Sequence, residues 1–248
     1  MTAVDPLFDL SGKVALVTGG SRGLGLEIVL AFAAHGADVI VTSRNSENCE
    51  EAAKRARALG RRAMAVGAHV GRWDEIDRLI DTAYAEFGRV DILVNNAGMS
   101  PPAPSYDVTE KLFDSVVNLN FKGPFRLAAQ IGKRMFDGDG GCIINVSSTG
   151  ALVPLPGVVP YSGAKAALNA MSVSLAHEYA PKVRVNTISA GPFLTDIAKS
   201  WPEEQRENVP NAMKRAGRPD EVVTSALFFA SPQSSFVTGA LLRCDGGI

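Results

Sequence analysis

The stretch Thr18-Gly19-Gly20-Ser21-Arg22-Gly23-Leu24-Gly25 separates two segments of different pattern. The apolar run Lys13–Thr18 before it predicts a strand, and the stretch from about Leu24 to His35 after it predicts a helix. The glycines allow a tight turn, and the free N–H groups at the start of a helix suit an anion such as a pyrophosphate. The spacing is neither Gly-x-Gly-x-x-Gly nor a P-loop, so a turn that binds no ligand is an equal alternative for this motif alone.

The same alternation of short apolar runs and longer amphipathic stretches continues along the chain. Further strands are expected at Val39–Thr42, Arg62–Val66, Asp91–Val94, Cys142–Val146, Val183–Ile188 and Leu241–Asp245. Further helices are expected at Glu47–Leu59, Trp73–Phe87, about Thr109–Phe136, Tyr161–Tyr179 and Pro219–Ala230. Continuous apolar strands separated by helices predict an α/β fold, with a doubly wound, seven-stranded parallel sheet covered by helices on both faces.

The chain is expected to form a single domain over residues 1–248, because no linker or low-complexity tract divides it. The least regular segment, at about 193–216, contains Trp201 and many polar residues. A segment of this kind is typical of a substrate loop or lid.

Composition excludes several classes of partner. The 25 basic and 26 acidic side chains give a net charge of -1, which predicts no binding to nucleic acid or to an anionic membrane. The odd, widely spaced cysteines Cys49, Cys142 and Cys244 favour reduced thiols over disulfides or a metal site. There is neither a leader pattern nor an apolar run of ~18 residues, so a cytoplasmic location is expected.

The end of the second strand indicates which dinucleotide the glycine turn would bind. Enzymes that use NAD place an acidic residue there, to hold the ribose hydroxyls. Here the strand runs into Thr42-Ser43-Arg44-Asn45, and Arg22 lies in the glycine turn itself. Two guanidinium groups suit a 2′-phosphate, so NADP(H) is favoured over NAD, the alternative being that Arg44 is a solvated loop charge.

Tyr161 and Lys165 are four residues apart, which places a phenol and an ammonium on one helix face. A tyrosine titrates near ~10, and a neighbouring positive charge lowers that pKa towards the range useful for proton transfer. The pair alone is weak support for a site. Ser148 ends a strand at the carboxyl edge of the sheet, where its hydroxyl would reach a substrate carbonyl or merely serve a turn.

Several motifs together carry a family resemblance. Thr18-Gly-x-x-x-Gly-x-Gly25, Asn95-Asn-Ala-Gly98, Ser148, Tyr161-x-x-x-Lys165 and Asp245-Gly246-Gly247 resemble, in order and spacing, the short-chain dehydrogenase/reductase family. The match runs from about Leu10 to the C-terminus, and it implies a Rossmann-type fold.

The resemblance implies catalytic roles. Tyr161 would be the general acid in reduction and the base in oxidation, with Lys165 lowering its pKa and holding the nicotinamide ribose. Ser148 would orient the carbonyl, and Asn120 would hold a water in the proton relay. Asn118 is the alternative to Asn120, but the register with Phe113-Asp114 and Gly123 favours Asn120.

The resemblance also implies a set of residues that bind the cofactor. They are Gly19, Ser21, Arg22, Gly23, Leu24, Gly25, Ser43, Arg44, His69, Val70, Asn96, Ala97, Gly98, Tyr161, Lys165, Gly191, Phe193 and Thr195. A homotetramer, or a homodimer, built through the helices at about Thr109–Phe136 and Tyr161–Tyr179 is implied as well.

Two positions depart from the family pattern. The chain has Ala68-His69-Val70 where the family usually has Asp-Val against the adenine amino group. A neutral His69 would still accept a hydrogen bond there, or it has no role. The chain also has Ala190-Gly191-Pro192 where Pro-Gly is usual, which puts the stiffness of that loop in question.

The expected function is NADP(H)-dependent interconversion of a carbonyl and a secondary alcohol. The substrate would be a 3-oxoacyl thioester, a sugar acid, a steroid or another cyclic ketone, against an apolar wall at Leu152–Val159. Two alternatives are an idle NADPH-binding sensor or scaffold, and an epimerase or dehydratase that retains its cofactor.

Overall fold

The computed structural model describes residues 5–196, 198 and 209–248. Within them, the strands form one parallel sheet of seven strands in the order β3-β2-β1-β4-β5-β6-β7, which confirms the predicted fold class. The strands are β1 (Val14–Thr18), β2 (Asp38–Ser43), β3 (Ala63–Gly67), β4 (Ile92–Asn95), β5 (Gly141–Ser148), β6 (Val183–Ala190) and β7 (Leu241–Cys244). The helices are α1 (Gly23–Ala34), α2 (Ser46–Ala58), α3 (Trp73–Phe87), α4 (Glu110–Val117), α5 (Gly123–Asp137), α6 (Val159–Glu178) and α8 (Val223–Ala230).

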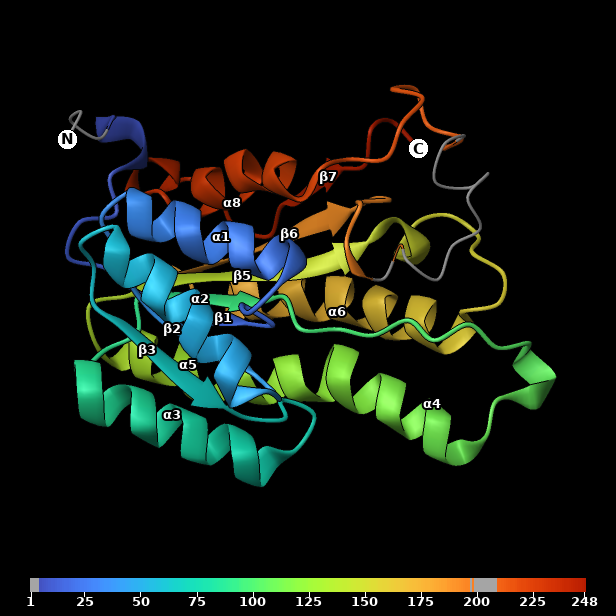
Figure 1. Cartoon of the computed structure of the whole chain (residues 1–248), viewed down its shortest axis with the longest axis horizontal. Coiled ribbons are helices and arrows are strands. Elements are labelled where there is room, and N and C mark those ends of the chain that lie inside the picture. The colour runs from blue at the N-terminus through green and yellow to red at the C-terminus, as the bar shows by residue number, and fades with distance from the viewer. Residues whose placement is uncertain (1–4, 197, 199–208) are drawn as a thin grey trace.

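Helices cover both faces of the sheet (Figure 1), as continuous apolar strands require. One core packs α1, α2 and α8 against the sheet around Phe32 and Phe229. The other packs α3, α5 and α6 on the opposite face, around Leu79 and Leu127. Every residue of β1 and β4 is buried, so these two strands lie at the centre of both cores.

The strand order reverses between β1 and β4, which are neighbours in the sheet although β2 and β3 lie between them in sequence. In open parallel sheets such a switch point leaves a crevice outside the carboxyl ends of the strands, where ligands bind. The glycine turn after β1 and the Asn95–Gly98 segment at the end of β4 both face this edge.

The long helix expected at about Thr109–Phe136 is interrupted by a π turn, Asn118–Lys122, between α4 and α5. Asn120 explains the interruption, because its side-chain Nδ2 donates to the Val116 carbonyl at 2.9 Å, the acceptor that its backbone N–H would use in an α-helix. The π turn also brings Gly123 against the carbonyl oxygen of Val70.

Other differences from the predicted elements are smaller. β5 extends to Ser148 because β6 pairs with it along its whole length, from Gly141↔Val183 to Ser148↔Ala190. The helix expected at Pro219–Ala230 begins as a 3₁₀ turn, Pro219–Val222, before α8. Of the expected loop at about 193–216, residues 197 and 199–208 lie outside the described residues. No helix among the described residues has both the length and the apolar character needed to cross a membrane.

Gly123 is expected to tolerate no side chain. A Cβ on this helical residue would lie 1.8 Å from the Val70 carbonyl oxygen, so Gly123→Ala must push α5 away from the loop after β3. We expect Gly123→Ala to lower the free energy of unfolding by about 3 kcal/mol or more, measured by denaturant titration. Gly163→Ala is the matched control, since a Cβ at this α6 position meets nothing within 4 Å. It should raise stability slightly, by up to about 1 kcal/mol, and equal losses in both variants would contradict the packing argument.

Candidate active site

The Thr18 side chain links the carboxyl ends of β1 and β4 by hydrogen bonds at the switch point. Its buried hydroxyl accepts hydrogen bonds from the backbone N–H groups of Asn96 at 3.0 Å and Ala97 at 3.1 Å, and donates to the Val94 carbonyl at 3.2 Å. The Asn96 Nδ2 donates in return to the Thr18 carbonyl at 2.9 Å. These contacts fix the Asn95–Gly98 segment beside the glycine turn, a role that the sequence motif did not reveal for Thr18.

The glycine turn has the shape expected of an anion cradle. Gly23 adopts φ +54°, a left-handed conformation that favours glycine, and a Cβ on Gly25 would lie 2.2 Å from the Gly19 carbonyl oxygen. Arg22 is the N-cap of α1, and its side chain makes no capping hydrogen bond among the described residues. The first N–H groups of α1, at Gly23, Leu24 and Gly25, therefore suit the pyrophosphate of a dinucleotide.

The residues expected around a 2′-phosphate come from two loops. Ser21 Oγ donates to Ser43 Oγ at 3.0 Å, which joins the glycine turn to the end of β2, and Arg44 is exposed beside them. Arg22 reaches in another direction, because its Nη1 lies 3.1 Å from Oδ2 of Asp196 in the segment after β6. The structure thus brings Ser21, Ser43 and Arg44 together, while Arg22 pairs with a carboxylate that no sequence motif indicated.

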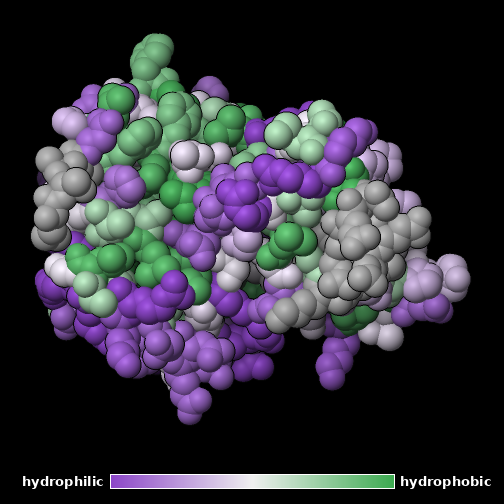
Figure 2. Space-filling model, turned by 45° about the horizontal axis from the view of Figure 1, so that its top comes forward, coloured by the Kyte–Doolittle hydropathy of each residue, from purple (hydrophilic) through white to green (hydrophobic). Residues whose placement is uncertain are grey.

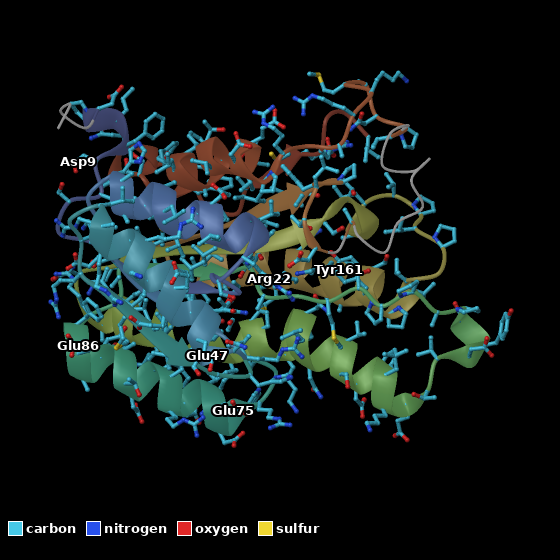
Figure 3. All side chains as sticks on the ribbon, viewed as in Figure 1. Asp9, Arg22, Glu47, Glu75, Glu86 and Tyr161 are labelled. Carbon is cyan, nitrogen blue, oxygen red and sulfur yellow. The ribbon has the colours of Figure 1, made fainter. Side chains whose placement is uncertain are left out.

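Tyr161, Lys165 and Ser148 converge where β5 meets α6. The Tyr161 hydroxyl faces the Ser148 side chain, and Ser148 Oγ accepts the Gly150 N–H at 3.1 Å. Lys165 Nζ lies 5.9 Å from the centroid of the Tyr161 ring and donates to the Val146 carbonyl at 2.8 Å. Figure 3 shows Tyr161 on α6 and Arg22 at the start of α1, both on the side of the molecule where the strands end.

Burial sets the pKa values of both ionisable groups. Lys165 is only 3% exposed, and loss of hydration lowers its pKa to about 8. Burial raises the pKa of Tyr161 above its ordinary value, although the hydrogen bond to Ser148 opposes that rise. Burial dominates the Tyr161 pKa in this structure, and the Lys165 ammonium donates to the Val146 carbonyl; the lowering of the Tyr161 pKa by Lys165 stays a prediction.

Asn120 is fully buried in the π turn, and its Nδ2 donates to the carbonyls of Met99 and Val116, each at 2.9 Å. Its Oδ1 is buried without a hydrogen-bond partner among the described residues. A Cβ on Gly98 would stand 2.8 Å from this oxygen and 3.6 Å from Lys165 Nζ, so both polar atoms flank the Gly98 backbone. An unsatisfied acceptor beside a lysine suits a bridging water.

His69 can donate a hydrogen bond rather than accept one. Its Nδ1 accepts the Gly71 N–H at 3.1 Å, so the neutral ring carries its proton on Nε2. In this arrangement an Nε2–H group suits a ring nitrogen acceptor, and the place of His69 at the adenine stays a prediction. The neighbouring Val70 is buried, and the His69 N–H donates to Glu75 Oε2 at 2.8 Å.

The segment after β6 is held without the usual Pro-Gly pair. The Gly217 N–H donates to the Pro192 carbonyl at 2.9 Å, and the Leu194 N–H donates to the Gly217 carbonyl at 2.8 Å. A Cβ on Gly191 would lie 2.5 Å from the Asp245 Cα, so the C-terminal Asp-Gly-Gly packs directly under this segment. Phe193 is buried, and Thr195 contacts the glycine turn at Gly23.

A buried chain of polar side chains, which sequence reasoning missed, supports the helix that carries Tyr161. Asn95 Nδ2 donates to Asn145 Oδ1 at 2.8 Å, and Asn145 Nδ2 donates to Ser172 Oγ on α6 at 2.8 Å. The signal in the sequence was an amide at Asn145, in the middle of an otherwise apolar strand. The residues described in the structure include no group of three or more His, Cys, Asp or Glu side chains arranged to hold a metal ion.

Comparison with known proteins gives consistent matches over nearly the whole chain. The family model for short chain dehydrogenases matches residues 13–206. The 3-oxoacyl-[acyl-carrier-protein] reductase of Thermotoga maritima is 35% identical over 242 residues, covering 96% of this chain and 98% of that protein.

Solved structures also match nearly the whole chain, at a similar sequence identity. A 7α-hydroxysteroid dehydrogenase complexed with NADH and 7-oxo glycochenodeoxycholic acid superposes with a TM-score of 0.93 and 34% identity, covering 98% of this chain and 96% of that one. A blue fluorescent protein from a metagenomic library, in complex with NADPH, gives a TM-score of 0.90 and 34% identity, covering 96% and 98%.

The buried Lys165 is expected to cost stability in a way that depends on pH. Below about pH 8 the Lys165 ammonium is charged in the folded and in the unfolded protein, and the folded protein bears the free-energy cost of burying it. This cost falls as the pH rises from about 8 towards 10.5, because the folded protein then buries a neutral amine. Without cofactor at pH 7, Lys165→Met should therefore have a higher free energy of unfolding than the wild type. Removing the buried charge should raise it by about 1–3 kcal/mol, and losing the hydrogen bond to Val146 offsets part of that gain.

The check is denaturant unfolding of the cofactor-free chain between pH 7 and 10, where the advantage of Lys165→Met should shrink as the pH rises. Lys111→Met, at an exposed position of α4, is the control and should change stability little. A stability difference between Lys165→Met and the wild type that does not change between pH 7 and 10 would show that the ammonium is not penalised.

Proposed function

The chain belongs to the short chain dehydrogenase family, and on that premise we propose that it is an NADP(H)-dependent oxidoreductase interconverting a ketone and a secondary alcohol. The observation that carries the proposal is the convergence of Tyr161, Ser148, Lys165 and Asn120 at the carboxyl edge of the sheet. When bound, NADP(H) would supply or accept the hydride.

The four side chains divide the proton chemistry among them. In reduction, Tyr161 delivers its phenolic proton to the substrate oxygen, which Ser148 holds in place by hydrogen bonding. In oxidation, Tyr161 acts in the reverse sense, as the base. Lys165 and the unsatisfied Oδ1 of Asn120 support a water between them that returns the proton to Tyr161.

The choice of NADP(H) rests on charge at the end of β2. Ser43 and Arg44 stand where a carboxylate would hold the ribose hydroxyls of NAD, and Ser21 is hydrogen-bonded to Ser43. The similar structures include one with NADH and one with NADPH, so relatives of this chain use both. Arg22 and Arg44 support NADP(H) here, and the backbone N–H groups from Gly23 to Gly25 would hold the pyrophosphate.

The proposed substrate is a ketone with apolar surface, of the 3-oxoacyl thioester, sugar-acid, steroid or other cyclic ketone type. Leu152 and Leu155 are exposed between β5 and α6, and Leu155 reaches beside Gly150 next to Ser148. The matches to an oxoacyl reductase and to a steroid dehydrogenase support this class of substrate.

We further propose a single-domain subunit that assembles as a homotetramer or homodimer in the cytoplasm. Exposed apolar side chains support assembly: Phe113, Phe125 and Val173 on the helices α4 to α6, and Phe228 and Phe236 near α8. Figure 2 shows apolar surface gathered on the side of the molecule that carries α8.

The state of the cysteines supports the proposed location. The three cysteines, all within the described residues, are free, which suits a reducing compartment.

Tyr161→Phe tests the proposal directly. We expect it to lower turnover of a panel of ketones with NADPH by about a hundredfold or more, because the proton donor is lost while the ring is kept. NADPH oxidation is followed by absorbance, with NADH in parallel. Tyr106→Phe, at a tyrosine 88% exposed and distant in sequence, is the control and should behave like the wild type. Wild-type turnover in Tyr161→Phe would refute the assignment, and cofactor binding without turnover of any ketone would favour the idle sensor or scaffold.

Ser148→Ala should move the pH profile of alcohol oxidation. The hydrogen bond from Ser148 lowers the Tyr161 pKa, and oxidation needs the tyrosinate, so the rate rises with pH through that pKa. Losing the bond should shift this rise to higher pH and reduce kcat. Ser162→Ala is the matched control, since the Ser162 hydroxyl has no hydrogen-bond partner in the described part of the chain. A profile unchanged in Ser148→Ala would remove Ser148 from the control of Tyr161.

A further inference from the structure

The glycine turn and the segment after β6 are joined by an ion pair. Arg22 Nη1 lies 3.1 Å from Asp196 Oδ2, and the side chains are 66% and 38% exposed. Arg22 extends from the N-cap of α1, and Asp196 follows Thr195, a residue expected near the nicotinamide. The pair therefore connects the two sides of the cofactor crevice.

Packing around the ion pair shows that the segment is seated on the turn. A Cβ on Gly23 would stand 3.4 Å from the Thr195 methyl group, so the Thr195 side chain lies beside the glycine turn. The Thr195 N–H donates to the Phe193 carbonyl at 2.8 Å, and the Ala198 N–H donates to the Thr195 carbonyl at 3.0 Å. This local turn presents the Asp196 carboxylate towards Arg22.

The Asp196 carboxylate is held by the guanidinium of Arg22, the N-cap residue of α1. A helix N-terminus and a guanidinium together favour a negative charge, which is also what makes this end of the helix suitable for a phosphate. The glycine turn reaches the 2′-phosphate region on its other side, through the hydrogen bond between Ser21 and Ser43. A 2′-phosphate bound beside Ser43 would offer Arg22 a second anionic partner besides Asp196, and the donors of Arg22 could not fully serve both at once.

We propose that Asp196 is a specificity-determining residue, whose carboxylate competes with the 2′-phosphate of the cofactor for Arg22. The inference rests on the proposed use of NADP(H) and concerns the strength of that preference. Asp196 weakens the binding of NADP(H) more than that of NAD(H), because only NADP(H) carries the competing phosphate. By reciprocity, a 2′-phosphate that takes Arg22 releases Asp196 from the turn.

The expected effect is modest, because both partners are exposed and solvent screens their attraction. Pairs of this kind change an equilibrium by about two- to fivefold. We therefore expect Asp196→Asn to bind NADP⁺ about two- to fivefold more tightly than the wild type does, with a smaller change for NAD⁺.

The experiment is calorimetric titration of the cofactor-free protein with NADP⁺ and with NAD⁺, which requires no substrate and no turnover. A rise in the ratio of NADP⁺ to NAD⁺ affinity in Asp196→Asn supports the inference. An unchanged or lower ratio, including equal weakening of both cofactors, overturns it, because Asp196 would then act only as a structural contact of the loop. Binding of NAD⁺ by the variant reports that it is folded.

Two further variants make the test specific. In an Arg22→Ala background the Asp196→Asn change should no longer alter the ratio, because the shared guanidinium is gone; a persisting rise would overturn competition for Arg22. Asp220→Asn removes an exposed carboxylate that pairs with Arg218 instead, and it should leave the ratio unchanged. If the ratio of NADP⁺ to NAD⁺ affinity rises as much in Asp220→Asn as in Asp196→Asn, the change in net charge explains the effect, and the inference is overturned.

The same titrations separate this inference from the proposed cofactor choice. The wild-type ratio and its fall in Arg22→Ala test the use of NADP(H), whereas the change on Asp196→Asn tests the competition. A wild type that prefers NADP⁺ but does not respond to Asp196→Asn contradicts only the inference. A wild type that prefers NAD⁺, with a ratio indifferent to both substitutions, contradicts both.

Discussion

The burial of the Lys165 ammonium is the constraint on which the rest of the site depends. A lysine this deep in a protein is held against the loss of its hydration, and here the Val146 carbonyl is its hydrogen-bond acceptor. Its pKa falls to about 8, so it loses its charge at a lower pH than the ordinary value of 10.5 would require. The same environment raises the pKa of Tyr161, leaving Ser148 as the group that lowers it.

The fold supports this arrangement through close backbone contacts. The π turn places Asn120 inside the protein, and Gly123 allows that turn to approach the loop after β3. Gly98 leaves room for Asn120 Oδ1 and Lys165 Nζ to face the same small space. Glycine is needed at both positions because a side chain would collide with the atoms opposite, and Gly98 lies in the segment after β4 whereas Gly123 begins α5.

Much of the fold follows from the sequence, for physical reasons that can be located. Apolar runs such as Val14–Thr18 are buried on both faces, so their character was visible without tertiary information. The spacing of Tyr161 and Lys165 placed them on one helix face, and Ser148 at a strand end placed it near them. The roles of these residues remain proposals, but their proximity follows from topology.

Other features depend on contacts between distant segments and could not be predicted. The π turn arises because the Asn120 side chain competes for a helix carbonyl while Gly123 meets Val70, about fifty residues earlier. The Arg22–Asp196 pair joins loops from opposite halves of the chain. The direction of the Tyr161 pKa shift depends on how much burial outweighs a single hydrogen bond, which spacing alone does not reveal.

The most direct test of burial as the controlling influence is an NMR titration of the cofactor-free protein, following the Lys165 Cε and Tyr161 Cζ resonances. Tyr161→Phe and Lys165→Met variants assign the two signals. We predict that Lys165 titrates at about pH 8 and that Tyr161 titrates above its ordinary value of 10. If both groups titrate at their ordinary values of 10.5 and 10, burial does not set the protonation states of this site, and the central claim is contradicted.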